Sequence, residues 1–179
     1  AYVILVHAKP DQPTLLADLL AKKSRIPVDL GEDGDRITGG RAYVTPTGFF
    51  PSLDKDKLFF EKPVDGPVAM PIDMMFRSLA EKLGERLAAV VLSGSNADGS
   101  QGIKAVKEAN GLLIVQDEGS AEHPTMPRHA VNTHTADFVL DPAEMVEKLH
   151  SFFDGLKTLQ DDDRKDGDRK VMNTICSIL

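Results

Sequence analysis

The sequence predicts an α/β fold: a doubly wound, mostly parallel sheet with helices on both faces and an antiparallel β-hairpin excursion. Short apolar runs alternate along the chain with segments whose apolar residues recur at helical spacing. Several of these runs are apolar on consecutive residues, which is typical of strands covered on both faces. The 179 residues, 41% of them hydrophobic, are enough for about one domain with a sizeable core.

The first third of the chain predicts a strand, a helix and a region of turns. Residues 2–6 form a short apolar run typical of a buried strand. Asp11 is the expected N-cap of the helix that follows. The expected apolar stripe of that helix is Leu15, Leu16, Leu19 and Leu20. Residues 28–30 predict a short strand, and residues 31–40 are rich in Gly and Asp, which is typical of turns.

The middle of the chain contains the clearest patterns. A strand at 42–45 and apolar runs up to residue 60 predict a β-hairpin or meander within 42–60. A helical pattern begins at Ile72, and Gly84 ends it. Residues 87–92 form the most continuous buried-strand signal in the sequence.

The later elements repeat the alternation of strand and helix. A Gly-, Ser- and Asn-rich loop at 93–102 opens a helix that ends at Asn110. Residues 112–115 predict a buried strand, and a short helix is expected near Pro127. Residues 138–140 predict another strand, and Pro142 begins the last helix of the domain.

The composition of the C-terminal residues predicts that the chain divides into three parts. Residues 1–153 are expected to be one domain, and residues 154–170, with six acids and five bases, a charged linker. Residues 171–179 begin a new amphipathic pattern, interpreted as the start of a following domain; the alternative is a C-terminal helix that docks on the same core. Ala1 already lies inside an apolar run, so the protein is expected to begin earlier.

Composition excludes several classes of protein. The net charge of −7 argues against nucleic-acid binding through a basic face. No run approaches the roughly 18 apolar residues that a membrane helix needs. The single cysteine, Cys176, cannot form an internal disulfide, so a reducing, cytoplasmic location is expected.

Two segments follow predicted strands and carry residues suited to catalysis. His7 comes directly after the first strand, where ligands bind in open α/β sheets, and a histidine there can act as a general base. The alternative is an ordinary surface histidine. The loop 93–99 follows the strongest strand; its Asp98 could orient a histidine ring, and its backbone N–H groups could face an anion. Alternatively, Asp98 or Ser100 is the N-cap of the next helix.

Other candidates are weaker. The same loop resembles a phosphate cradle, but it lacks the P-loop spacing and its lysine. A metal site would require His123, His129 and His134 to converge with a carboxylate such as Glu122, and their spacing disfavours this. Neither a metal nor an organic cofactor is expected. Met126 is expected to fill the core or line the rim of a pocket.

Taken in order, the motifs resemble the catalytic domain of the CheB-type protein-glutamate methylesterases. The matching segments lie at 3–7, 10–11, 32–34, 43–46, 71–73, 76–80, 92–94, 98–99, 102–109, 116–117 and 126–128. They cover roughly residues 1–152. The sequence is especially similar to fusion proteins in which this domain precedes a CheR-type methyltransferase, so the expected following domain is CheR-like and the chain a piece truncated at both ends.

The resemblance implies a Ser-His-Asp triad. It assigns the histidine to His7 and the aspartate to Asp98. The family's serine belongs to a Gly-Ala-Ser-x-Gly-Gly loop one strand–helix unit upstream, which is absent from these 179 residues. Residues 1–179 alone are therefore expected to be inactive.

The resemblance also implies an oxyanion or substrate loop formed by Ser95, Asn96 and Met126, with a backbone N–H near Ser95 at the oxyanion. Two positions depart from the family pattern. Val6 stands where the family often has Gln, and Asn96 stands where it has Gly. Asn96 could narrow the loop or supply a hydrogen bond of its own.

The implied reaction is hydrolysis of glutamate methyl esters on chemoreceptor-like proteins, with glutamine deamidation as the same acyl chemistry. The implied partners are methylated chemoreceptor helices and a response regulator or another signalling domain, without nucleic acid or membrane insertion. One alternative is a catalytically inactive regulatory module of a chemotaxis-like signalling fusion. Another is an anion- or nucleotide-binding domain that uses the 93–99 loop.

Overall fold

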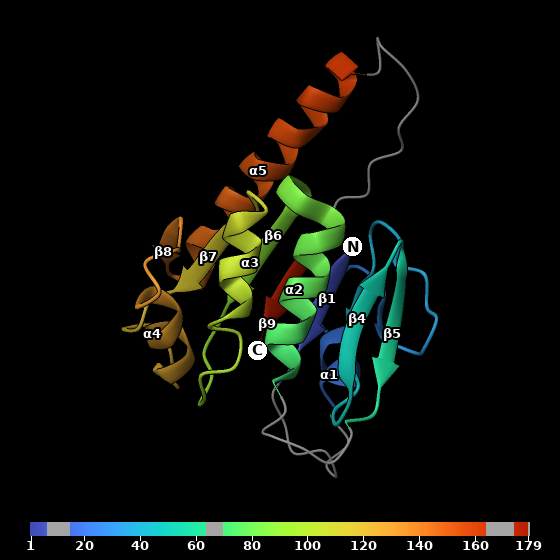
Figure 1. Cartoon of the computed structure of the whole chain (residues 1–179), viewed down its shortest axis with the longest axis horizontal. Helices are drawn as coiled ribbons and strands as arrows, with labels where there is room; N and C mark the ends of the chain where they lie inside the picture. The colour runs from blue at the N-terminus through green and yellow to red at the C-terminus, as the bar shows by residue number, and fades with distance from the viewer. Residues whose placement is uncertain (7–14, 64–69, 164–173, 179) are drawn as a thin grey trace.

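The computed structural model describes residues 1–6, 15–63, 70–163 and 174–178, which form a seven-stranded sheet flanked by helices (Figure 1). Its strand order is β2-β3-β1-β9-β6-β7-β8, and every neighbouring pair is parallel. The strands are β1 (Tyr2–Leu5), β2 (Val28–Leu30), β3 (Ala42–Val44), β6 (Leu87–Val91), β7 (Leu112–Gln116), β8 (Phe138–Leu140) and β9 (Thr174–Ile178). The helices are α1 (Leu16–Ala21), α2 (Pro71–Leu83), α3 (Gly102–Glu108), α4 (Thr125–Val131) and α5 (Pro142–Asp163), with a 3-10 turn at Gly84–Arg86. The predicted α/β fold is confirmed.

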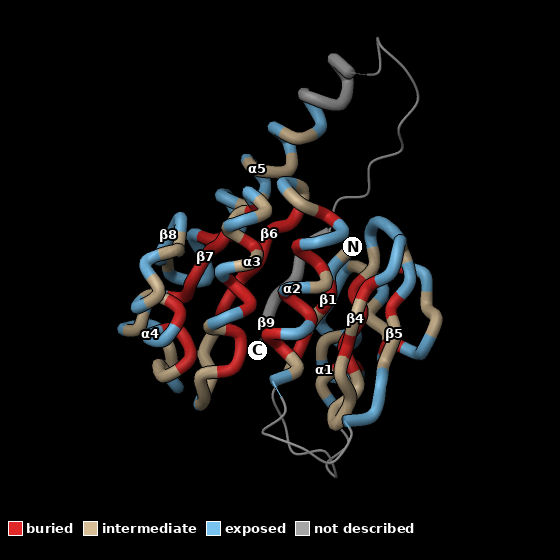
Figure 2. Tube along the Cα trace, in the orientation of Figure 1, coloured by how far each residue is buried: buried red, intermediate tan, exposed pale blue. Residues whose placement is uncertain are grey.

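Alternate residues of the central strands point into two apolar clusters, one on each face of the sheet. Ala89 and Val91 of β6 join the larger cluster, which contains residues of α2, α3 and α4. Val90, between them, packs with Met145 of α5 in the smaller cluster. This period of two is the pleat of a β-strand, and it explains why these runs are apolar on consecutive residues. Figure 2 shows the buried strands between the helices.

The antiparallel excursion is a hairpin of β4 (Phe50–Asp54) and β5 (Lys57–Glu61), which forms a separate two-stranded sheet. Its turn contains Lys55 with a positive φ of 56°. Ser78 of α2 fixes the hairpin, because its hydroxyl accepts from the Leu53 N–H at 2.8 Å and donates to the Leu53 carbonyl at 3.1 Å. The hairpin is therefore shorter than the predicted region 42–60, since residues 42–44 belong to the main sheet.

The apolar stripe expected in the first helix is wrong in part. Asp11, its expected N-cap, lies outside the described residues. Leu15 and Leu19 are 67% and 56% exposed, and the buried residue of α1 is Ala17. The helix is only six residues long, and it contacts β2 and β3. A small residue allows α1 to lie close to these strands, while Leu16 and Leu20 are half-buried and Leu19 is exposed.

The charged linker expected from residue 154 begins inside a helix. α5 has 22 residues and continues to Asp163. Lys157 pairs with Asp154 at 2.8 Å, and the Thr158 hydroxyl donates to the Asp154 carbonyl at 3.0 Å. Contacts three and four residues apart stabilise helices, so mixed charge here favours a helix over an extended linker. Residues 164–170 lie outside the described part.

β9 is the largest departure from the sequence-based expectation, which interpreted residues 171–179 as the start of a following domain or, alternatively, as a C-terminal helix docked on the same core. Thr174–Ile178 instead form a strand between β1 and β6, with Ile175 opposite both Tyr2 and Ala88. The facing edges of β1 and β6 leave backbone groups that a parallel strand satisfies, and this favours a strand over a helix. A following domain stays a prediction.

The parallel strands end together at one edge, the lower edge in Figure 1. The chain runs from β1 toward β2 and β3 on one side, and from β6 toward β7 and β8 on the other. The strand order thus reverses around β9, and ligands bind at such switch points in open α/β sheets. Among the described ranges, no helix combines the length and the apolar character needed to cross a membrane.

Candidate active site

Asp98 lies in the loop after β6, and its carboxylate is almost completely buried, with 1% exposure. One oxygen accepts from the Ile72 N–H at 3.1 Å, and the other accepts from the Asp73 N–H at 3.0 Å. These are N–H groups of the first turn of α2, whose own N-cap residue, Met70, makes no side-chain cap hydrogen bond. Asp98 therefore caps α2 from a distant part of the chain.

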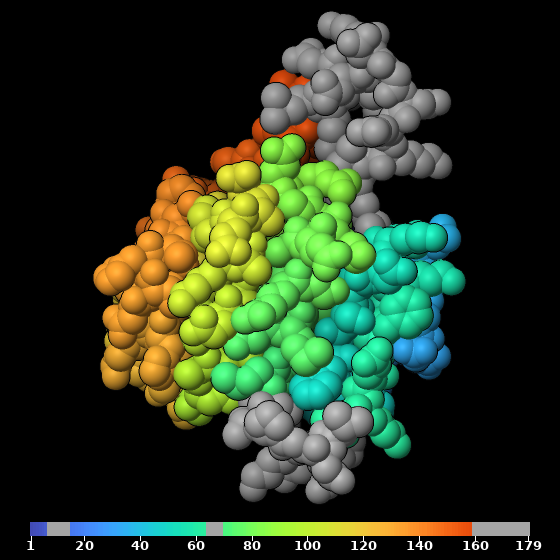
Figure 3. Space-filling model, in the orientation of Figure 1, coloured from blue at the N-terminus to red at the C-terminus, as the bar shows by residue number. Residues whose placement is uncertain are grey.

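The prediction that Asp98 or Ser100 caps the helix after the loop is thus wrong. That cap comes from Asp73, one Oδ of which accepts from the Gln101 N–H at 2.9 Å and from the Gly102 N–H at 2.5 Å. The two helices therefore cap each other. Asp98, in the loop before α3, caps α2, and Asp73, in the first turn of α2, caps α3. Figure 3 shows the two helices side by side on this face of the molecule.

The exchange requires close contact between the helices, and Gly102 permits it. A Cβ at this position would lie 2.7 Å from the Phe76 Cβ and 2.9 Å from the Asp73 Cα and carbonyl oxygen. Any larger residue would push α3 away from α2. Because the N-terminal N–H groups of α3 already face Asp73, they are not available to a phosphate, which disfavours the anion-binding alternative.

The loop 93–97 is fixed by the neighbouring loop after β7. Buried Gln116 accepts from the Ser93 N–H at 2.8 Å and donates to the Ser120 carbonyl at 3.0 Å. The Ser93 hydroxyl accepts from the His123 N–H at 2.9 Å. Backbone bonds then join Gly94 to His123 and to Met126, at 2.8 and 2.9 Å. Hydrogen bonds to the segment after β7 therefore fix one side of the loop that is expected to hold an oxyanion.

The three residues expected in that loop lie in different environments. Ser95 is exposed, whereas Met126 is 3% exposed and packs beneath Gly94. Asn96 is half-buried, and its side-chain oxygen accepts from the Asp98 N–H at 2.9 Å. Of the two roles considered for Asn96, the structure has the hydrogen bond, which orders the backbone before Asp98.

His7 lies outside the described residues. The structure describes β1, the strand before it, which is separated from β6 by β9 alone. Strands lie about 4.8 Å apart, so the ends of β1 and β6 are about 10 Å apart. The segment that carries His7 and the loop that carries Asp98 thus begin at neighbouring places on one edge.

The histidine cluster considered for a metal does not assemble. His123, His129 and His134 are all exposed. Within the described part of the chain, no group of three His, Cys, Asp or Glu residues could hold a metal ion.

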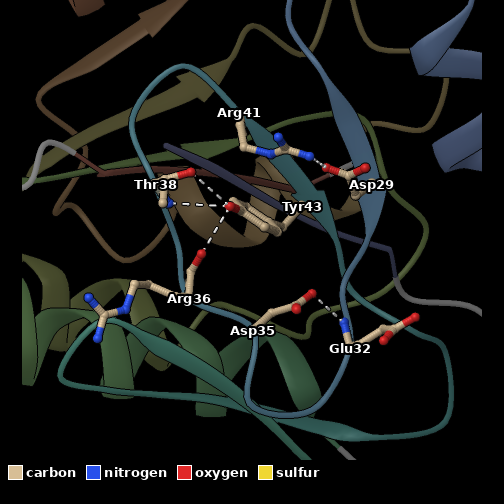
Figure 4. A network of polar contacts seen from close by, with 7 residues as sticks. All are labelled: Asp29, Glu32, Asp35, Arg36, Thr38, Arg41 and Tyr43. Carbon is tan, nitrogen blue, oxygen red and sulfur yellow. Dashed lines mark hydrogen bonds and ion pairs between the residues drawn. The ribbon is translucent and has the colours of Figure 1, made fainter.

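A pocket of about 710 Å³ lies elsewhere, beside β2, β3 and α1. Figure 4 shows its polar network: the Tyr43 hydroxyl donates to the Arg36 carbonyl at 3.0 Å, and Arg41 pairs with Asp29 at 2.6 Å. The hydrogen bond and charge of Asp29 raise the pKa of the Arg41 guanidinium. This pocket contains none of the residues that the sequence assigned to catalysis.

Sequence reasoning missed the functions of Asp73 and Gln116. In the sequence, both stand out only as members of matching segments, Asp73 at 71–73 and Gln116 at 116–117. A polar residue directly after four apolar strand residues, as at 112–116, was the available signal for a buried hydrogen bond. The partner of Asp73 is 28 residues away, and no local pattern indicates it.

Comparisons with known proteins show which family the chain resembles. The family model described as CheB methylesterase matches residues 1–149. A putative protein-glutamate methylesterase/protein-glutamine glutaminase of Leptospira interrogans is 33% identical over 138 residues, which cover 72% of this chain and 68% of that protein. The protein-glutamate methylesterase/protein-glutamine glutaminase of Escherichia coli K12 is 29% identical over 154 residues, or 83% of this chain.

The solved structures give the same result. The crystal structure of the Thermotoga maritima CheB methylesterase catalytic domain matches with a TM-score of 0.74 at 28% identity, over 82% of this chain and 80% of that one. The chain spans only 44% of the length of the Escherichia coli relative. The family model nevertheless matches well over half of the residues, and the chain belongs to the CheB methylesterase family.

Proposed function

We propose that this chain forms most of a serine esterase that hydrolyses glutamate methyl esters on chemoreceptor-like proteins. The observation that carries the proposal is the buried Asp98 carboxylate, held at the switch-point edge by two N–H groups of α2. Its match to the aspartate of the family supports a role as the acid of a Ser-His-Asp triad. Relatives with 33% and 29% identity are named protein-glutamate methylesterase/protein-glutamine glutaminase, the first as putative.

In this mechanism His7 takes the proton of the nucleophilic serine as the serine attacks the ester carbonyl. Asp98 orients the ring of His7 and stabilises its imidazolium. A backbone N–H near Ser95 donates to the oxyanion of the tetrahedral intermediate. The intermediate expels methoxide, which receives the proton from His7, and water then hydrolyses the acyl-enzyme. With glutamine the leaving group is ammonia.

The serine itself is proposed to lie in a segment that precedes Ala1. Ser93 is a poor candidate, because its hydroxyl accepts from His123 and ties the loop to its neighbour. The proposed location is the cytoplasm, where methylated receptor helices are the substrate and a response regulator or another signalling domain controls access. A CheR-like domain that follows this one remains part of the same proposal.

The test is release of methanol from methylated receptor by the protein extended with the segment before Ala1. The His7→Ala variant should lose this activity, while His150→Ala, which changes an exposed histidine on α5, should retain it. Residues 1–179 alone should release none. A folded extended protein without activity would overturn the esterase proposal and favour the regulatory module.

A further inference from the structure

We propose that Asp73 is a positioning residue for the reaction, one that holds the N–H groups of α2 against the Asp98 carboxylate. This inference rests on the proposed esterase function and assigns to Asp73 no contact with substrate. It concerns a buried charged group, 7% exposed, that the triad mechanism does not otherwise use.

The first argument is the position of Asp73 in both caps. Its backbone N–H donates to Asp98 at 3.0 Å, and its side-chain carboxylate accepts from Gln101 and Gly102. These contacts close a ring that runs from Asp73 to Asp98, along the loop to Gly102, and back to Asp73. The Asp73 carboxylate accepts from N–H groups at the start of α3 and itself lies in the first turn of α2, so it gains charge-assisted hydrogen bonds and a favourable interaction with both helix dipoles.

The second argument is the stiffness of this ring. The loop between Asp98 and α3 contains only three residues, and the Asp98 N–H is already bonded to Asn96. Gly102 lies so close to Asp73 that a Cβ would contact its backbone at 2.9 Å. The distance between the start of α2 and the start of α3 therefore sets where the Asp98 carboxylate lies.

The catalytic consequence follows from the precision that a triad needs. The acid must present its oxygen to the histidine in one orientation, and a displacement of about 1 Å can reduce the rate about 100-fold. Loss of the Asp73 charge weakens the bonds to Gln101 and Gly102 and loosens the start of α2. We expect a lower kcat with little change in KM, since Asp73 is buried and does not form the substrate surface.

The experiment compares Asp73→Asn with Asp137→Asn in the extended protein. Asparagine keeps the size of the side chain and one acceptor but removes the charge. Asp137 is a matched control, because its carboxylate also accepts a backbone N–H, from Leu113 at 2.7 Å, and pairs with Lys107 at 2.7 Å. It lies before β8 and beside the start of β7, at the opposite edge of the sheet.

Three quantities are measured: kcat, KM and the hydrogen exchange of the Ile72 amide by NMR. Asp73→Asn should lower kcat about 10- to 100-fold with KM within about 2-fold, and should speed exchange at Ile72. Asp137→Asn should leave all three close to the wild-type values. Equal kcat in the wild type and Asp73→Asn would overturn the proposal, and so would a kcat loss shared equally by Asp137→Asn.

A second variant keeps the test open if Asp73→Asn does not fold. Gln101→Pro removes one of the donors to Asp73 without changing its charge, and Gln101 is exposed with a φ of −90°, about 25° from the value that proline fixes. It should lower kcat several-fold, and an unchanged kcat would contradict the proposal that the bonds of Asp73 to the start of α3 position Asp98. An inactive wild type would overturn the esterase proposal, whereas an active wild type that tolerates both variants would overturn only the role of Asp73.

Discussion

The two wings of the central sheet hold their polar groups in different ways. In the wing of β6, β7, α2 and α3, Asp73, Asp98 and Gln116 are buried and bonded to backbone N–H groups of other elements. In the wing of β2, β3 and α1, the strands have three residues each. There Arg41 pairs with Asp29 while their side chains remain 43% and 44% exposed.

This difference indicates where stability and catalytic geometry depend on the same atoms. A buried carboxylate that is lost leaves N–H groups without partners, which costs far more than the loss of a surface ion pair. Variants of the first wing should therefore change both folding and activity. Variants of the exposed Arg41–Asp29 pair in the second wing should change neither by much.

The largest effect is expected for Asp98→Ala. It leaves the N–H groups of Ile72 and Asp73 without their acceptor at the start of α2. We expect a loss of about 2–4 kcal/mol in the free energy of unfolding, measured by urea titration of residues 1–179. A loss below about 1 kcal/mol would contradict the capping function of Asp98.

Gly102→Ala tests the close contact of α2 with α3. The new Cβ would lie within 3 Å of Phe76 and of the Asp73 backbone, so we expect about 1–3 kcal/mol of destabilisation. The matched control is Gly155→Ala in α5, where nothing lies within 4 Å of the added Cβ. That variant should stabilise by up to about 1 kcal/mol, and thermal unfolding distinguishes the two. Equal shifts of Tm would mean that the contact is unimportant.

Gln116→Leu should have a moderate effect. The leucine has a similar size, but it lacks the acceptor of the Ser93 N–H and the donor to the Ser120 carbonyl. We expect about 1–2 kcal/mol of destabilisation and faster amide exchange at Ser93 than at residues of α2. If the Ser93 amide stays as protected as in the wild type, Gln116 does not hold the loop.

Arg41→Ala should have the smallest effect, below about 1 kcal/mol, because both partners of the ion pair are partly exposed to water. The remaining difference from the wild type should shrink further in 1 M salt, where surface charges are screened. Chemical denaturation at low and high salt measures both. A loss comparable to that of Asp98→Ala would contradict the distinction between the wings.

The sequence predicted the strands of both wings, since β2 and β3 lie at the expected residues 28–30 and 42–45 to within one residue. The strand at 87–91 and the helix at 71–83 have long, clear patterns, so their limits were predicted within about a residue. Leu15 and Leu19 follow a helical stripe, yet the short α1 buries Ala17 instead. The pattern at 171–179 suggested a helix, whereas pairing with β1 and β6 makes residues 174–178 a strand. Such long-range pairing leaves no local signal.

The candidate site shows the same limit. The position of Asp98 after a buried strand marked it as a candidate, and the family resemblance gave it a role. Its contacts with Ile72 and Asp73 span 26 and 25 residues, and those of Asp73 with α3 span 28 and 29. Spacing within a segment therefore suggested a local cap, and only the packing of α2 on α3 determines the actual one.

The most direct test of the account is the rate of methanol release by Asp98→Asn in the extended protein, with folding checked by thermal unfolding. Asparagine keeps one acceptor for the start of α2 but cannot stabilise the imidazolium of His7. A folded variant whose kcat falls about 10³- to 10⁴-fold is the predicted result. A folded variant that keeps kcat within about 10-fold of the wild type would contradict a triad containing Asp98.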